Sequence, residues 1–159
     1  MNKFDLLEQR ESEMSASDPK AQFSDVLAEF GALAKQDISL NEDGIATFAV
    51  DDEVLVNLQF LEESRTVVAF APVGGFGGTA APDAGEKALE LLRLCKLGGP
   101  VGEWTLALDA DADLVLAMDR RLAFEISSAD ALAAWIDSLV RAVRAVRERF
   151  AERFPEKED

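Results

Sequence analysis

The chain has 159 residues and a formal net charge of −15, and 48% of its residues are hydrophobic. This length fits one domain that can bury a sizeable core without disulfides, and a single cysteine cannot form an internal bridge. The acidic charge argues against binding to nucleic acid, because phosphates require a basic surface. The sequence has no histidine and no tyrosine, which excludes Ser-His and Cys-His catalysis and histidine-ligated metal sites.

The two ends of the sequence predict little regular structure. Residues 1–18 mix apolar residues with acids and serines, so we expect a flexible N-terminal arm, and residues 155–159 predict a frayed tail. Residues 19–154 then form a single domain. The N-terminus lacks the apolar stretch of a signal peptide, and no stretch is long and apolar enough to cross a membrane. We therefore expect a cytoplasmic protein.

Residues 19–36 predict an amphipathic helix. Ser17 or Asp18 can cap it, and Pro19 fits its first turn. Its apolar residues recur at spacings of three and four, which is the period of a helix with one buried face: Phe23, Val26, Leu27, Phe30, Leu33 and Ala34.

The next two apolar segments predict a β-hairpin, since their apolar period is two. If residues 51–53 form a three-residue loop, Val50 lies opposite Val54 and Phe48 lies opposite Val56. The apolar faces of both strands then coincide, which makes the register self-consistent.

A third strand is predicted at residues 65–73, after a loop at residues 62–64. The same pairing test places Phe60 opposite Thr66. The other face of this strand is also apolar but carries small residues, so the strand is either central or covered by something else. That face consists of Val67, Ala69, Ala71 and Val73.

Residues 73–82, VGGFGGTAAP, predict a flexible loop after the third strand. Glycine-rich loops at such a place can bind phosphate. This one lacks the Gly-Lys-Ser/Thr ending of a P-loop, and its glycine spacing does not match a dinucleotide-binding motif. We therefore expect no nucleotide site here.

Residues 83–97, DAGEKALELLRLCKL, predict the central helix of the chain. Asp83 can cap it, with Glu86 as the reciprocal partner of a capping box. Its leucines cover far more than one stripe, so the helix requires two apolar neighbours. One can be the sheet, and the other can be the same helix of a second copy, because a two-fold contact is self-complementary. The alternative is a helix buried in the centre of a monomer core.

The segment from Trp104 to Met118 predicts a second hairpin around a D-x-D-x-D turn. Pairing Leu106 with Leu116 also pairs Trp104 with Met118. The turn resembles the opening of an EF-hand loop, but Leu114 replaces the glycine that such a loop needs. We therefore interpret these acids as turn residues and expect no metal site.

The last predicted helix follows Ser127 or Ser128, and its apolar residues recur at four-three spacing. Arg141, Arg144 and Arg147 lie on the opposite side, which predicts a solvated basic face. Every acidic cluster in the sequence falls in a predicted turn, where carboxylates rarely catalyse. An enzyme is therefore the weaker hypothesis, and we expect no cofactor.

The sequence resembles the class I chaperones of type III secretion, the Tir-chaperone (CesT-like) family. The segments that carry the likeness are LNEDGIATFAVDDEVLVNLQF, ALELLRLCKL, GEWTLALDADADLVLAM and ALAAWIDSLVRAV, in that order, within about residues 19–146. The N-terminal arm and the glycine-rich segment depart from the family pattern. The resemblance implies an α+β fold in which helices pack on an antiparallel twisted sheet.

The family resemblance also implies a cytoplasmic homodimer without enzymatic activity. Such chaperones hold the N-terminal segment of a secreted effector, their client, in extended form, and the export ATPase is a further candidate partner. An alternative is a regulator that sequesters a transcription activator or another chaperone. A small enzyme that uses acids alone is a third.

Two sets of residues are candidates for these contacts. An extended client can add a strand to a sheet edge and place its side chains in apolar pockets. For the client site we expect residues of the first helix and first three strands: Phe23, Val26, Phe30, Phe48, Val67, Ala69 and Ala71. For the dimer interface we expect residues of the central helix and second hairpin: Leu89, Leu92, Cys95, Trp104, Leu106 and Leu116.

Overall fold

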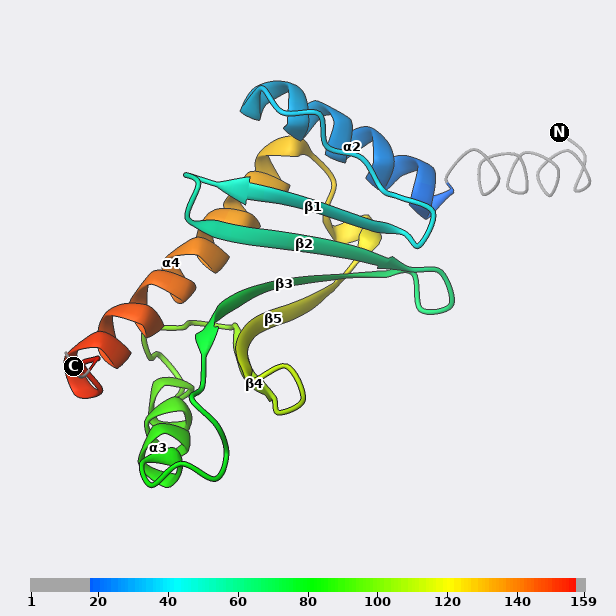
Figure 1. The fold of residues 1–159 in the computed structure, drawn as a ribbon. Coiled ribbons are helices and arrows are strands. Elements are labelled where there is room, and N and C mark those ends of the chain that lie inside the picture. Colours follow the sequence, from blue (N-terminus) through cyan, green and yellow to red (C-terminus); the bar gives the residue numbers. More distant parts are fainter. Residues whose placement is uncertain (1–17, 157–159) are drawn as a thin grey trace, which may run out of the picture.

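The computed structural model describes residues 18–156, which form three α-helices and one five-stranded sheet (Figure 1). The predicted order of helices and strands is confirmed. The predicted arm and tail lie outside the described residues, except for Asp18, Pro155 and Glu156. The elements are α2 (Pro19–Ala34), β1 (Ile45–Val50), β2 (Val54–Leu61), β3 (Thr66–Gly75), α3 (Ala84–Leu94), β4 (Thr105–Asp109), β5 (Leu114–Leu122), the 3₁₀ turn η1 (Ala123–Glu125) and α4 (Ala129–Arg153).

Neighbouring strands of the sheet are all antiparallel, in the order β1-β2-β3-β5-β4. β3 is therefore the central strand, and β1 and β4 are the edges. The hairpin of β1 and β2 has the predicted register, with Val50 opposite Val54 and Phe48 opposite Val56. The α+β fold with an antiparallel sheet is confirmed.

The register between β2 and β3 differs by one residue from the predicted one. Phe60 lies opposite Val67 rather than Thr66, because the loop comprises residues 62–65 and ends on Arg65 in the left-handed region, at φ 53°. A shift of one residue exchanges the two faces of a strand. The small residues of β3 therefore face the core and are buried: Val67, Ala69, Ala71 and Val73.

The register between β4 and β5 was also predicted wrongly by one residue. The loop comprises residues 110–113 and ends on Asp113 at φ 53°, so Leu106 lies opposite Ala117 rather than Leu116. Leu106 consequently packs against the core, whereas Leu116 points to the other face of the sheet.

The core lies between one face of the sheet and the helices α2 and α4, and α4 runs across that face (Figure 1). Ala69, Ala71 and Ala117 are fully buried there, and their small size lets the helix approach the strands closely. Phe23 of α2 stacks on Phe60 with ring centroids 6.3 Å apart. α4 contributes the largest set of buried side chains, which includes Leu132, Trp135, Ile136, Leu139, Val143 and Val146.

The opposite face of the sheet, which we call the bare face, is apolar where β3 meets β5. Phe70 lies opposite Met118 and Pro72 lies opposite Leu116, and all four are half-buried. None of the four belongs to the core cluster that the described helices share with the sheet. Within residues 18–156, this apolar surface is left without a helix packed on it.

The arginine face of α4 is only partly solvated. Arg141 and Arg144 are exposed. The Arg144 guanidinium donates to the carboxylates of Asp51 and Glu53 at 2.8 and 3.1 Å, and the bonds to Glu53 and then Asp51 raise the pKa of Arg144. The prediction is wrong for Arg147, which is half-buried and donates to two backbone carbonyls of β3, because α4 passes over the end of that strand.

α3 is shorter than the predicted helix at residues 83–97, since it ends at Leu94. Asp83 is the N-cap residue as predicted, but the predicted capping hydrogen bonds are absent. The Asp83 side chain makes no capping hydrogen bond, and its carboxylate lies 3.4 Å from Lys87 Nζ instead.

The leucines of α3 divide between two sides. Leu91 and Leu94 are buried and belong to the core cluster, whereas Leu89 and Leu92 are 47% and 71% exposed. The alternative of a helix buried in the centre of a monomer core is therefore wrong. A helix with apolar residues on its outer side still offers a surface for a second apolar neighbour.

Glu90 of α3 is almost fully buried and ties this helix to the last turns of α4. Its carboxylate oxygens lie 3.5 Å from Arg93, 3.8 Å from Arg149 and 3.7 Å from Arg153, and Oε2 has no hydrogen-bond partner. A buried carboxylate is costly unless cations surround it. The position of α3 therefore depends on these three guanidinium groups.

We expect the double substitution Arg149→Ala with Arg153→Ala to lower the free energy of unfolding by about 1–3 kcal/mol, because it leaves the buried carboxylate with one cation. Adding Glu90→Leu should restore most of that loss, since an apolar side chain needs no counter-charge. Urea denaturation measures both effects. Glu86→Leu, at an exposed acid of the same helix, is the control and should not restore stability. Equal recovery from both leucine substitutions would contradict this role for Glu90.

Candidate functional site

An apolar groove lies between the end of α2, β1 and α4. It contains a pocket of about 330 Å³. Phe30 and Phe48 meet there with ring centroids 5.5 Å apart, so two of the residues expected to bind a client share this site. The pocket has an apolar lining and a charged rim, made by Phe30, Ala34, Phe48, Val50, Ile136 and Val140 and by Asp51, Asp137 and Arg144.

The other residues expected at the client site lie in the core or at its border. Phe23 is buried, and Val26 packs on the core from a half-buried position. Val67, Ala69 and Ala71 are fully buried on the face that α4 covers. The expectation that this small-residue face of β3 is uncovered is wrong, because the register turns it inward. The accessible part of the expected surface is the groove around Phe30.

β1 borders this groove as an edge strand whose outer side is partly occupied. Asn41 exchanges two hydrogen bonds with the backbone of Ile45, at 2.9 and 3.0 Å, and the Gln36 amide donates to the Ala49 carbonyl at 3.2 Å. Alternation in an antiparallel ladder then points the backbone of Thr47 outward as well. No backbone hydrogen bond within residues 18–156 occupies Thr47 on that side, but the segment from Gln36 to Asn41 runs along this edge between these two contacts (Figure 1).

Three of the residues expected at a dimer interface lie on the outer side of α3 or just after it. Leu89 and Leu92 are exposed on the helix, and Cys95 is exposed at its C-cap. Among residues 18–156, none covers this side of α3, which can therefore take a second copy.

The remaining expected interface residues lie in different places. Leu116 is on the bare face, Leu106 packs on the core side, and Trp104 is buried. Sequence reasoning missed Phe70 and Met118, which complete the bare face beside Leu116. The available signal was that the third strand is apolar on both sides.

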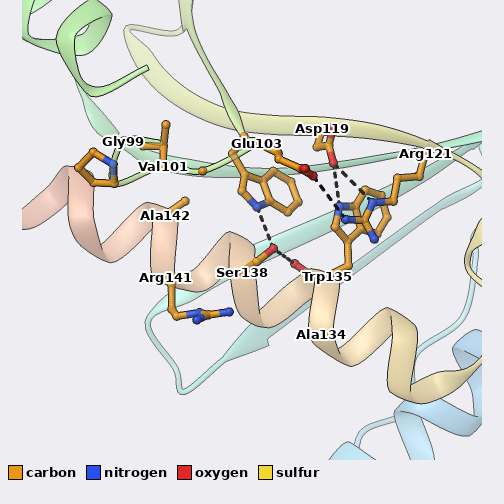
Figure 2. Close-up of a pocket in the computed structure, with 13 residues that line it drawn as sticks. Gly99, Val101, Glu103, Asp119, Arg121, Ala134, Trp135, Ser138, Arg141 and Ala142 are labelled. Carbon is orange, nitrogen blue, oxygen red and sulfur yellow. Dashed lines mark hydrogen bonds and ion pairs between the residues drawn. The ribbon is translucent and has the colours of Figure 1, made fainter. Parts of the chain in front are cut away.

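Trp104 lines a pocket of about 460 Å³ between the loop before β4, β5 and α4 (Figure 2). Its ring stacks on Trp135 with centroids 5.7 Å apart, and its Nε1 donates to Ser138 at 2.9 Å. Trp135 Nε1 donates to Asp119 at 2.9 Å, and the Arg121 guanidinium covers the Trp135 ring at 5.0 Å. These partners hold both indoles in place, so the two tryptophans have a structural role here.

Two of the three acids of the D-x-D-x-D turn bind backbone amides. Asp109 accepts from Ala112 at 3.1 Å, and Asp113 accepts from Gly77 and Gly78 at 3.1 and 2.8 Å. Within residues 18–156, no group of three His, Cys, Asp or Glu residues could hold a metal ion. No helix in that range is long and apolar enough to cross a membrane.

Several solved structures are similar to this chain. One is a chain of the crystal structure of the Yersinia pestis type III secretion chaperone SycH in complex with a stable fragment of YscM2. It has 26% sequence identity and a TM-score of 0.58, and the match covers 78% of this chain and 98% of that chain. No curated protein sequence matches significantly.

Two further structures have lower identity and show the fold alone. A chain of the ExsC–ExsE complex has 20% identity and a TM-score of 0.64, with coverage of 82% of this chain and 95% of that chain. A chain of the ExoU–SpcU complex from the type III secretion system of Pseudomonas aeruginosa has 16% identity and a TM-score of 0.56, with coverage of 79% and 94%.

The protein-family comparison covers most of the chain. The model of the Tir chaperone protein (CesT) family matches residues 25–147. This range contains all five strands, α3, and most of α2 and α4. The chain therefore belongs to the Tir chaperone protein (CesT) family.

Proposed function

We propose that this protein is a cytoplasmic chaperone of a type III secretion system that holds the N-terminal segment of a secreted effector in extended form and has no enzymatic activity. Membership in a chaperone family supports this function. So does the SycH structure, which contains a bound fragment of YscM2. The observation that carries the proposal is the groove between α2, β1 and α4, in which Phe30 and Phe48 meet.

The groove offers an extended client mainly apolar contacts. A client strand would pair with the outward backbone groups of Thr47 only by displacing the segment from Gln36 to Asn41. Apolar client side chains can enter the pocket formed by Phe30 and Phe48. The net charge of −15 favours basic residues flanking these anchors.

The same proposal includes a homodimer. The bare face and the outer side of α3 are apolar surfaces that a second copy can cover, since a two-fold contact buries the same surface on both copies. The net negative charge also keeps a protein with exposed apolar areas soluble. Arg144 forms a hydrogen bond with the β1–β2 turn, and Arg147 forms one with β3. Because these arginines already have partners within the protein, their contacts support the proposal that it does not bind nucleic acid.

We expect Ala34→Glu to weaken binding of an effector's N-terminal segment at least about tenfold, because a carboxylate at the mouth of an apolar pocket costs about 1.4 kcal/mol or more when a client covers it. Ala32→Glu is the matched control, since Ala32 is also exposed on α2 but does not line the pocket. Isothermal titration with an effector encoded beside this gene gives both dissociation constants. An equal effect of the two substitutions would place the client elsewhere.

The protection pattern tests the geometry of the complex. Hydrogen exchange should slow in α2 and β1 when the effector segment binds. Protection limited to the exposed arginines of α4 would contradict the groove. Capture of one folded regulatory protein, with no binding of extended effector segments, would support the alternative of a sequestering regulator.

We expect the unmutated protein to be a dimer at micromolar concentration and Leu92→Asp to make it a monomer. A leucine that becomes buried contributes about 1.5–3 kcal/mol to the free energy of association, and a two-fold interface contains this leucine from both copies. Leu33→Asp is the control, because Leu33 on α2 is 69% exposed and Leu92 is 71% exposed. Light scattering gives the molar mass. A monomer without any substitution would refute the dimer, and loss of the dimer in both variants would exclude α3 as its specific contact.

A further inference from the structure

The glycine-rich segment around residues 76–78 is held in place by several contacts, in contrast to the flexible loop predicted from the sequence. We call this segment the glycine-rich wall. Gly77 and Gly78 donate their amides to the Asp113 carboxylate, and Phe76 is buried. Lys87 Nζ donates to the Phe76 carbonyl at 2.9 Å. Gly77 has φ +91°, a backbone conformation that residues with a side chain rarely adopt, so this position favours glycine.

This wall encloses one side of a pocket of about 500 Å³. Such a volume is within the range of ligand pockets in proteins. The opposite side is the end of α4, where Phe150 and Phe154 lie with ring centroids 5.3 Å apart. The apolar lining comes from β3, β5 and α4: Val73, Val115, Val146, Phe150, Ala151 and Phe154.

The pocket also contains a half-buried cation that no described carboxylate balances. Arg147 donates to the carbonyls of Val73 at 2.8 Å, Glu53 at 3.1 Å and Pro72 at 3.4 Å, and within residues 18–156 it has no ion pair within 4 Å. Glu156, the carboxylate that lines the pocket, is exposed at its rim. Charge-assisted hydrogen bonds to a ligand carboxylate would use the remaining N–H groups of the guanidinium.

Beyond the carbonyls of Pro72 and Val73, which Arg147 occupies, the end of β3 at Gly74 and Gly75 has room for an extended backbone. Pairing between β2 and β3 ends at Asn57 and Phe70, whereas β3 continues to Gly75 with β5 alone as its strand neighbour. Gly74 and Gly75 line the pocket and carry no side chain that would keep a peptide away. These features favour a peptide over a compact small molecule.

We propose that this pocket binds a peptide segment in which a large apolar residue adjoins an acidic residue. The apolar side chain enters between the glycine-rich wall and the phenylalanines of α4, and the carboxylate meets Arg147. This site is separate from the groove at β1, because the two pockets share no apolar lining residue. The proposal holds whether or not the segment belongs to an effector.

Two synthetic peptides test the chemistry of the site, one with Phe-Glu and one with Phe-Lys between identical Gly-Ser flanks. Each is titrated into the full ¹⁵N-labelled chain, and amide shifts are followed by NMR. The Phe-Glu peptide should shift the amides of Gly74, Gly75, Gly77 and Val115, and the Phe-Lys peptide should bind at least about tenfold more weakly. Equal binding of the two peptides, or shifts located elsewhere, would overturn the proposal.

A matched pair of substitutions tests the location without altering Arg147. Ala151→Phe fills the pocket from its exposed side, and Ala134→Phe makes the same change on an exposed part of α4 that lines a different pocket. Ala151→Phe should weaken binding of the Phe-Glu peptide at least about tenfold, and Ala134→Phe should leave it unchanged. Unchanged binding in Ala151→Phe would overturn the assignment of this pocket.

Discussion

The close contact between α4 and the centre of the sheet is the packing on which the rest of the structure depends. Ala69 and Ala71 of β3 and Ala117 of β5 are fully buried beneath the helix. Larger side chains at these positions would push α4 away from the strands. Because α4 lies across the centre of the sheet, it can contact α2 on one side and α3 on the other. The grooves of the molecule form beside these helix contacts.

Local patterns in the sequence predicted the helices, the strands and the β1–β2 hairpin. They did not predict the other two registers, because each loop contains four residues and ends in a left-handed conformation at Arg65 or Asp113. Neither position carries the glycine that usually marks this geometry. The predicted register is wrong by only one residue, but this shift exchanges the two faces of β3, so the prediction placed its buried face outward.

The functional surfaces were predictable only in part. Phe30 and Phe48 follow from the apolar periods of α2 and β1, because each belongs to one element's own pattern. Phe70 and Met118 meet through pairing between β3 and β5, strands that are separated by α3 and β4 in the sequence. No local pattern specifies that contact. The cluster around Glu90 was missed for the same reason, since its cations come from two helices.

Arg147 has a consequence for how the fold forms. Its guanidinium binds carbonyls of Glu53, Pro72 and Val73, at the end of the sheet where β2 and β3 no longer pair. A side chain of α4 therefore replaces the ladder hydrogen bonds that a neighbouring strand would supply. Those carbonyls obtain their partner only after the helix has docked, so completion of the sheet and docking of the last helix form one cooperative, long-range event.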